Sequence, residues 1–80
     1  MNKDKIFSEI KRIIVESADI PEEEINENSL LMDDLELSSL EVLDLIAHLE
    51  EVFQICFSEK ELRKIISIKD LVDYIQNVLD

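Results

Sequence analysis

The chain of 80 residues contains no glycine and no tryptophan, and only one proline and one cysteine. Without glycine there is no glycine-rich loop to hold a phosphate group and no glycine to end a helix. The single cysteine, Cys56, excludes an internal disulfide, which fits a protein of the reducing cytoplasm. No apolar run approaches the ~18 residues of a membrane-spanning helix, and Met1 leads straight into charged residues rather than a signal peptide. We therefore expect a cytoplasmic protein without a membrane span.

Basic residues are also scarce. There are 8 of them against 20 acidic residues, which gives a formal net charge of -12. Nucleic acids and anionic membranes are bound through basic faces, so we expect neither as a partner. An acidic surface favours partners with basic patches, although it also serves solubility alone.

Length and periodicity predict one small helical domain over residues 1–80. Asn2 can cap a first helix over about residues 3–17. Ser38 and Glu41 fit the capping-box pattern and open a second helix that ends at Phe53. Within residues 1–80, no strand-like alternation stands out.

Two further serines, Ser58 and Ser67, begin capping-box patterns that open a short third helix and a last helix. The apolar face of the last helix is expected to consist of Leu71, Val72, Ile75, Val78 and Leu79. We predict an all-α fold, a small four-helix bundle with three main helices and one short one, present as a monomer.

The second helix has both a core stripe and an outward apolar set. At 100° per residue, the core stripe lies within about 60° of Val42 and comprises Val42, Leu45, Ile46, Leu49 and Phe53. On the far side, three apolar residues lie among acids; this set is Leu40, Leu43 and Ala47 beside Asp44, Glu50 and Glu51. Such a face suggests a docking surface, although single exposed leucines are also normal on small proteins.

The sequence offers little for catalysis or metal binding. Ser39 would be the first helical residue, with a hydroxyl that the cap does not need. His48 lies nine residues further along the same helix, roughly 13 Å away, so it cannot activate Ser39 as in a hydrolase. The acids around residues 33–36 lack the spacing and the glycine of a calcium loop, and His48 with Cys56 is too small a set for zinc. The apolar context of Cys56 is typical of packing rather than of a reactive thiol.

Several segments together resemble the acyl carrier protein family, including its peptidyl and aryl carriers. They are Asp34-Leu35, Ser39-Leu40, the acidic stretch 41–53, and segments 58–62 and 68–75, which match the family's third and fourth helices. In that family a transferase esterifies the serine of an Asp-Ser-Leu motif with phosphopantetheine, whose thiol carries an acyl or aminoacyl group. The resemblance therefore implies that Ser39 is the phosphopantetheine attachment site and that the protein is not itself an enzyme.

The resemblance also implies partners. They are a phosphopantetheinyl transferase and acyl- or aminoacyl-loading and acyl-transfer enzymes with basic docking patches. The implied docking residues are Leu40, Glu41, Leu43, Asp44, Ala47, Glu50 and Glu51. Carriers of this family can shelter an acyl chain between helices, and by position Leu45, Leu49, Phe57, Leu62, Ile65 and Tyr74 line such a space or simply form the core.

One departure from the family pattern leaves two functions open. The family usually reads Leu-Gly-x-Asp-Ser-Leu, so Glu36 stands in place of Gly and Ser38 in place of Asp. Ser38 can still cap the helix, which favours Ser39 as the modified serine. The departure hints at a specialised carrier, whose cargo is a fatty acyl, polyketide, aminoacyl or other acid. The alternative is an unmodified, carrier-like acidic helical module that acts in protein–protein interaction or regulation.

Overall fold

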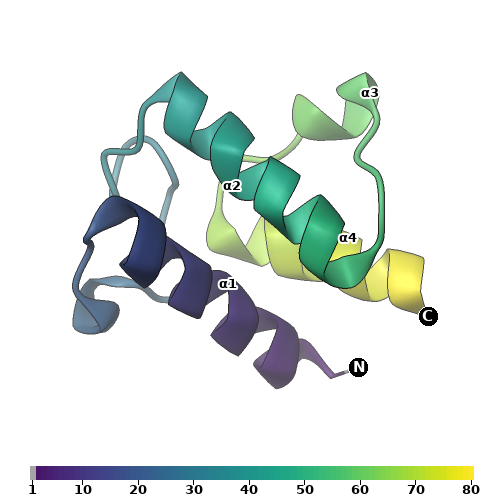
Figure 1. The fold of residues 1–80 in the computed structure, drawn as a ribbon, viewed down its shortest axis with the longest axis horizontal. Coiled ribbons are helices and arrows are strands. Elements are labelled where there is room, and N and C mark those ends of the chain that lie inside the picture. The colour runs from purple at the N-terminus through teal and green to yellow at the C-terminus, as the bar shows by residue number, and fades with distance from the viewer. Residues whose placement is uncertain (1) are drawn as a thin grey trace.

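The computed structural model describes residues 2–80 as four α-helices and one short 3-10 helix (Figure 1). In chain order these elements are α1 (Lys3–Ala18), η1 (Glu22–Glu24), α2 (Ser39–Phe53), α3 (Glu59–Leu62) and α4 (Ile68–Leu79). Helix α1 packs against both α4 and α2. The prediction of an all-α fold with three main helices and one short helix is confirmed.

The first two long helices begin at the caps that the sequence predicts. Asn2 Oδ1 accepts a hydrogen bond from the Lys5 backbone N–H at 2.9 Å. Ser38 Oγ accepts from the Glu41 N–H at 3.1 Å, and the Glu41 carboxylate accepts from the Ser38 N–H at 2.9 Å. This complete capping box satisfies two backbone donors and makes Ser39 the first residue of α2.

The two later caps differ from each other. Ser67 and Asp70 form a second complete capping box at the start of α4. At α3, Ser58 Oγ accepts from the Glu61 N–H at 3.2 Å, but only this half of the predicted box forms. The prediction of a full box at Ser58 is therefore wrong, and α3 is only one turn long.

The core consists mainly of aliphatic residues from the three long helices and the connection between α1 and α2, together with Phe53, Ile55 and Phe57 at and after the end of α2. Its fully buried members are Ile6, Ile10, Ile14, Leu31, Leu49, Ile68, Leu71 and Ile75. Val78 and Leu79, which we predicted on the apolar face of α4, are 45% and 39% exposed. They lie in the last turn of α4, at the C-terminal edge of the bundle (Figure 1), where the helix extends past its packing partners.

The long α1–α2 connection is joined to the turn before α4. The Leu31 N–H donates to the Ile66 carbonyl at 2.9 Å, and the Ile68 N–H donates to the Ser29 carbonyl at 3.0 Å. The Asp70 carboxylate fixes the same turn, because its Oδ2 accepts from the N–H groups of Ile66 and Ser67, each at 2.9 Å. Burial by itself would raise the pKa of Asp70, but the hydrogen bonds outweigh it and the pKa lies below its usual value.

We expect Asp70→Ala to lower the free energy of unfolding by about 1–2 kcal/mol at neutral pH, because two backbone donors lose their acceptor. A carboxylate with a lowered pKa in the folded state contributes stability that is present above about pH 4 and is lost as pH falls through the lowered folded pKa. The free energies of unfolding of wild type and variant, measured by urea unfolding, should therefore converge in acid. Asp44→Ala, which removes an exposed carboxylate, is the control, and a wild-type advantage over Asp70→Ala that stayed constant down to about pH 2.5 would contradict this account.

Candidate functional site

The two serines at the start of α2 have different surroundings. The Ser38 hydroxyl accepts the Glu41 N–H as the helix cap. Ser39 is exposed at the first helical position, where its hydroxyl has no part in the capping box. Ser39 therefore offers an accessible hydroxyl on a rigid helix end.

The start of α2 also suits a phosphate ester. The first N–H groups of a helix have no partner within the helix, and the helix dipole places partial positive charge there. A phosphate bonded to Ser39 would lie beside this positive end. The residues present therefore fit a phosphorylated prosthetic group on Ser39, although Glu41, two residues further along α2, adds negative charge nearby.

Glu36, which replaces the family's glycine, has left-handed backbone with φ of 57°. This conformation places Cβ close to the carbonyl oxygen and costs a non-glycine residue about 1–2 kcal/mol. The turn that leads into Ser39 thus has a backbone conformation that glycine adopts easily, with a glutamate at that position.

We expect Glu36→Gly to raise the free energy of unfolding by about 0.5–1 kcal/mol. Glycine removes the left-handed strain, and its larger entropy loss on folding offsets part of that gain. Gln54, with φ of 56° at the end of α2, should respond in the same direction to Gln54→Gly. Glu51→Gly inside α2 should instead cost about 1 kcal/mol. Urea midpoints measure all three, and a loss of stability in Glu36→Gly would argue against strain at this turn.

Most of the predicted docking residues lie on the solvent side of α2. Leu40 and Leu43 are 78% and 53% exposed, which is high for leucine. The other exposed members are Glu41, Asp44, Ala47 and Glu51. None of the ion pairs formed within residues 2–80 uses an α2 carboxylate. This surface therefore has apolar side chains and negative charge without internal compensation.

Glu50 differs from the other predicted docking residues. It is half-buried, and its Oε2 accepts a hydrogen bond from the Phe57 backbone N–H at 2.8 Å. The contact joins the end of α2 to the segment before α3. Glu50 thus has an internal structural partner that the helical phase alone did not indicate.

A groove beside Val42, near the start of α2, includes only one residue of our predicted sites, Ile65. Its volume is about 190 Å³, and its lining residues are Leu30, Leu31, Met32, Asp33, Val42, Ile65 and Ile66. We call it the Val42 groove, because Val42 lies one helical turn after Ser39. In the sequence, the signal for this groove was the presence of two apolar residues, Met32 and Ile66, in connecting segments. In the structure, these two residues are 52% and 60% exposed.

The six residues expected to line a sheltered space do not line one common cavity in the structure. Leu45, Leu49 and Phe57 are buried, whereas the other three are half-buried. Leu45 lines a small pocket of about 30 Å³ between α1 and α2, while Ile65 lines the Val42 groove. In the structure these residues therefore divide between the core and separate surface pockets.

Tyr74 closes the core beside the segment before α3. Its ring lies 4.4 Å from that of Phe57, and its hydroxyl donates to the Cys56 carbonyl at 2.6 Å. Burial raises the pKa of Tyr74, and the charge of Glu61 adds to this, so the phenol stays a donor. Cys56 itself is exposed between buried Ile55 and Phe57, so our prediction that its side chain packs was wrong. Burial alternates along residues 55–57, because the side chains on either side of Cys56 pack into the core and leave that of Cys56 facing outward.

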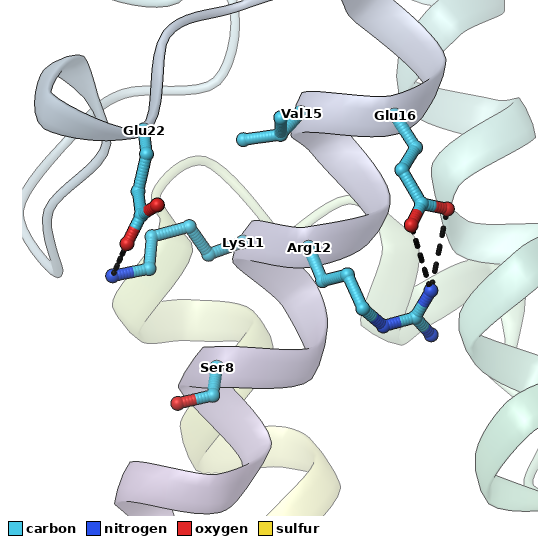
Figure 2. Close-up of a pocket in the computed structure, with 6 residues that line it drawn as sticks. All are labelled: Ser8, Lys11, Arg12, Val15, Glu16 and Glu22. Carbon is cyan, nitrogen blue, oxygen red and sulfur yellow. Dashed lines mark hydrogen bonds and ion pairs between the residues drawn. The ribbon is translucent and has the colours of Figure 1, made fainter.

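A pocket of about 310 Å³ lies between α1 and η1, and none of its lining residues is a predicted site residue (Figure 2). Lys11 Nζ lies 3.3 Å from the Glu22 carboxylate, and Arg12 Nη1 lies 3.3 Å from that of Glu16. Hydrogen bonding to Glu9, with a further contribution from Glu16, raises the pKa of Arg12. Because the cations already have partners, this pocket has little charge to offer a ligand.

Two other features bear on the site. Within residues 2–80, no group of three or more His, Cys, Asp or Glu side chains is placed to hold a metal ion. In the same range, no helix has both the length and the apolar character needed to cross a membrane.

Comparison with known proteins assigns the chain to a family. Residues 8–75 match the family described as "Phosphopantetheine attachment site". The acyl carrier protein of Coprothermobacter proteolyticus is 42% identical over 79 residues, covering 99% of this chain and 96% of the relative. The acyl carrier protein of Campylobacter hominis is 36% identical over 92% of this chain and 94% of its own length. The acyl carrier protein of Thermotoga maritima is 35% identical over 98% of this chain and 96% of its own length.

These similarities extend over nearly the whole chain and agree with the helical architecture and the exposed serine. Members of the family bear covalently bound phosphopantetheine and work with phosphopantetheinyl transferases and acyl-handling enzymes. They are carriers rather than enzymes. The chain therefore belongs to the phosphopantetheine-binding acyl carrier protein family.

Proposed function

We propose that this carrier bears its phosphopantetheine on Ser39 and presents thioester-bound acyl or aminoacyl intermediates to partner enzymes. The observation that supports this most strongly is the division between the two serines. The Ser38 hydroxyl caps α2, whereas Ser39 is exposed at the first helical position and free of the cap. The phosphate would there lie at the positive end of the α2 dipole.

The modification would proceed as a phosphoryl-group transfer from coenzyme A. A bond forms between Ser39 Oγ and the phosphorus next to the pantetheine, and the pyrophosphate bond of coenzyme A breaks. Adenosine 3′,5′-bisphosphate leaves, and the hydroxyl proton passes to a base of the transferase. The protein gains an arm with a terminal thiol, which carries the acyl group as a thioester.

The proposed docking surface is the exposed side of α2, whose residues are Leu40, Glu41, Leu43, Asp44, Ala47, Glu50 and Glu51. Within residues 2–80, none of its carboxylates takes part in an ion pair, although those of Glu41 and Glu50 accept the backbone N–H groups of Ser38 and Phe57. This uncompensated negative charge fits partner enzymes with basic patches, and the exposed leucines supply apolar contact. Charge-steered, short-lived docking suits a carrier that leaves one enzyme for the next. The tether raises the effective concentration of the intermediate at each enzyme.

We assign the carrier to a specialised biosynthetic pathway in the cytoplasm, with fatty acid synthesis as the competing pathway. Ser38 and Glu36, in place of the usual acid and glycine, support the specialised assignment. The same departure favours a second candidate function, an unmodified acidic module for protein interaction.

Incubation with coenzyme A and a promiscuous phosphopantetheinyl transferase, followed by intact-mass measurement, separates the two functions. The carrier proposal predicts a single added phosphopantetheine. A folded protein left unmodified by several such transferases, with a conventional acyl carrier protein modified in parallel, would favour the interaction module.

A further inference from the structure

We propose, on the basis of the proposed attachment of the arm to Ser39, that this carrier delivers short acyl or aminoacyl groups and gives no shelter to a long apolar chain. The space between the end of α2 and α4, where such a chain would be buried, is filled by the rings of Phe57 and Tyr74. We call these two side chains the aromatic pair. The proposed function leaves the length of the cargo open, and the aromatic pair limits it.

Phe57 lies between α2 and α4 and contacts both. Its backbone N–H donates to the Glu50 carboxylate of α2 at 2.8 Å. Its ring lies 4.4 Å from that of Tyr74 on α4, with 30° between the two ring planes. Phe57 is only 7% exposed and belongs to the core. Its ring therefore takes up volume between the two helices that a buried acyl chain would need.

Three contacts hold the aromatic pair in place. The Tyr74 hydroxyl donates to the Cys56 carbonyl at 2.6 Å, which joins α4 to the segment before α3. The stacked rings and the hydrogen bond between Glu50 and Phe57 are the other two. Aromatic stacking and hydrogen bonds in a shielded site both stabilise the closed arrangement. An entering chain would have to displace a ring, and an alkyl chain cannot replace the hydrogen bonds lost.

Two other spaces beside α2 offer little shelter. The pocket between α1 and α2 has a volume of about 30 Å³, which is room for only about one or two waters. The Val42 groove is larger, but two of its lining residues, Met32 and Ile66, are more than half exposed. A long chain lying in this open groove would keep much of its apolar surface in water.

The length of the cargo follows from the hydrophobic effect. The cost of leaving an apolar chain in water grows with its surface area. A short acyl group exposes few methylenes, and an aminoacyl group carries a charge that water solvates well. Neither needs a buried site, so both suit a carrier whose interior is already filled.

The test uses the full chain loaded with butanoyl- or octanoyl-phosphopantetheine from the corresponding acyl-coenzyme A, with its mass checked first. Cleavage of each thioester by hydroxylamine is followed by intact mass, and each rate is divided by that of the same acyl group on free pantetheine. In wild type, the two normalised rates should be equal, because neither chain is buried. Phe57→Ala opens the space and should slow cleavage of the octanoyl thioester severalfold. Val78→Ala, which shortens an exposed apolar residue, should leave both rates unchanged.

Tyr74→Leu is a second variant, which removes the stacking and the hydroxyl but keeps an apolar side chain, in case Phe57→Ala does not fold. Octanoyl protected severalfold over butanoyl in wild type would overturn the inference alone. Folded Phe57→Ala or Tyr74→Leu that gives octanoyl no protection would also overturn it, because the aromatic pair would not be what closes the space. A folded chain that takes up neither acyl-phosphopantetheine would instead overturn the proposed function.

Discussion

Ser39→Ala is expected to abolish the transfer of phosphopantetheine from coenzyme A, leaving no modified protein at times when wild type is fully converted. The substitution removes the only atom that we propose to bond to phosphorus. It leaves the capping box intact, because that box uses the side chains of Ser38 and Glu41. The helix should therefore remain, and intact mass before and after incubation measures the loss.

Ser38→Ala is the matched control, one residue away. It should lower the free energy of unfolding by about 1 kcal/mol through loss of the cap, yet the folded protein should still accept one phosphopantetheine. Ser38→Asp keeps a capping side chain and restores the acid usual in the family, so it should be modified at least as fast as wild type. If folded Ser38→Ala resisted modification while Ser39→Ala accepted it, the assignment of the two serines would be reversed.

Reversing two charges on α2, in the pair Asp44→Lys with Glu51→Lys, is expected to slow modification at least tenfold at low ionic strength. A tenfold change corresponds to about 1.4 kcal/mol, which two interface charges can supply when repulsion replaces attraction. Both carboxylates are exposed and outside the internal ion pairs, so the fold should tolerate the change. Transfer rates at several salt concentrations measure the effect, which should shrink as salt screens it.

The control pair is Glu23→Lys with Glu27→Lys, two exposed acids of the α1–α2 connection. It changes the net charge by the same amount but lies outside the docking surface. We expect it to slow modification much less. Equal slowing by the two pairs would mean that net charge, rather than the α2 surface, guides the transferase.

The sequence predicted correctly those features that depend only on residues close together in the chain, namely helix capping and helical periodicity. The α2 helix begins at Ser39 as predicted, because a capping box depends only on residues three apart, and it also ends at the predicted Phe53. Helical phase likewise separated buried Leu45 and Leu49 from exposed Leu40. These features are decided within a single helix, so periodicity was sufficient to find them.

Predictions failed where contacts between distant segments decide the result. Phase placed Glu50 outward, but the Phe57 N–H seven residues later holds its carboxylate. Periodicity placed Val78 inward, but no pattern within α4 shows where its packing partners end. The Val42 groove could not be predicted, because its walls come from segments far apart in the sequence that are joined by the backbone hydrogen bond between Leu31 and Ile66.

The central claim is that phosphopantetheine is carried on Ser39, and its most direct test is fragment mass spectrometry of the modified wild-type protein. Peptides that contain Ser38 and Ser39 should show a single phosphopantetheine, and fragmentation between the two residues should place it on Ser39. Phosphopantetheine found on Ser38, or on another residue while Ser39 stays free, would contradict the account.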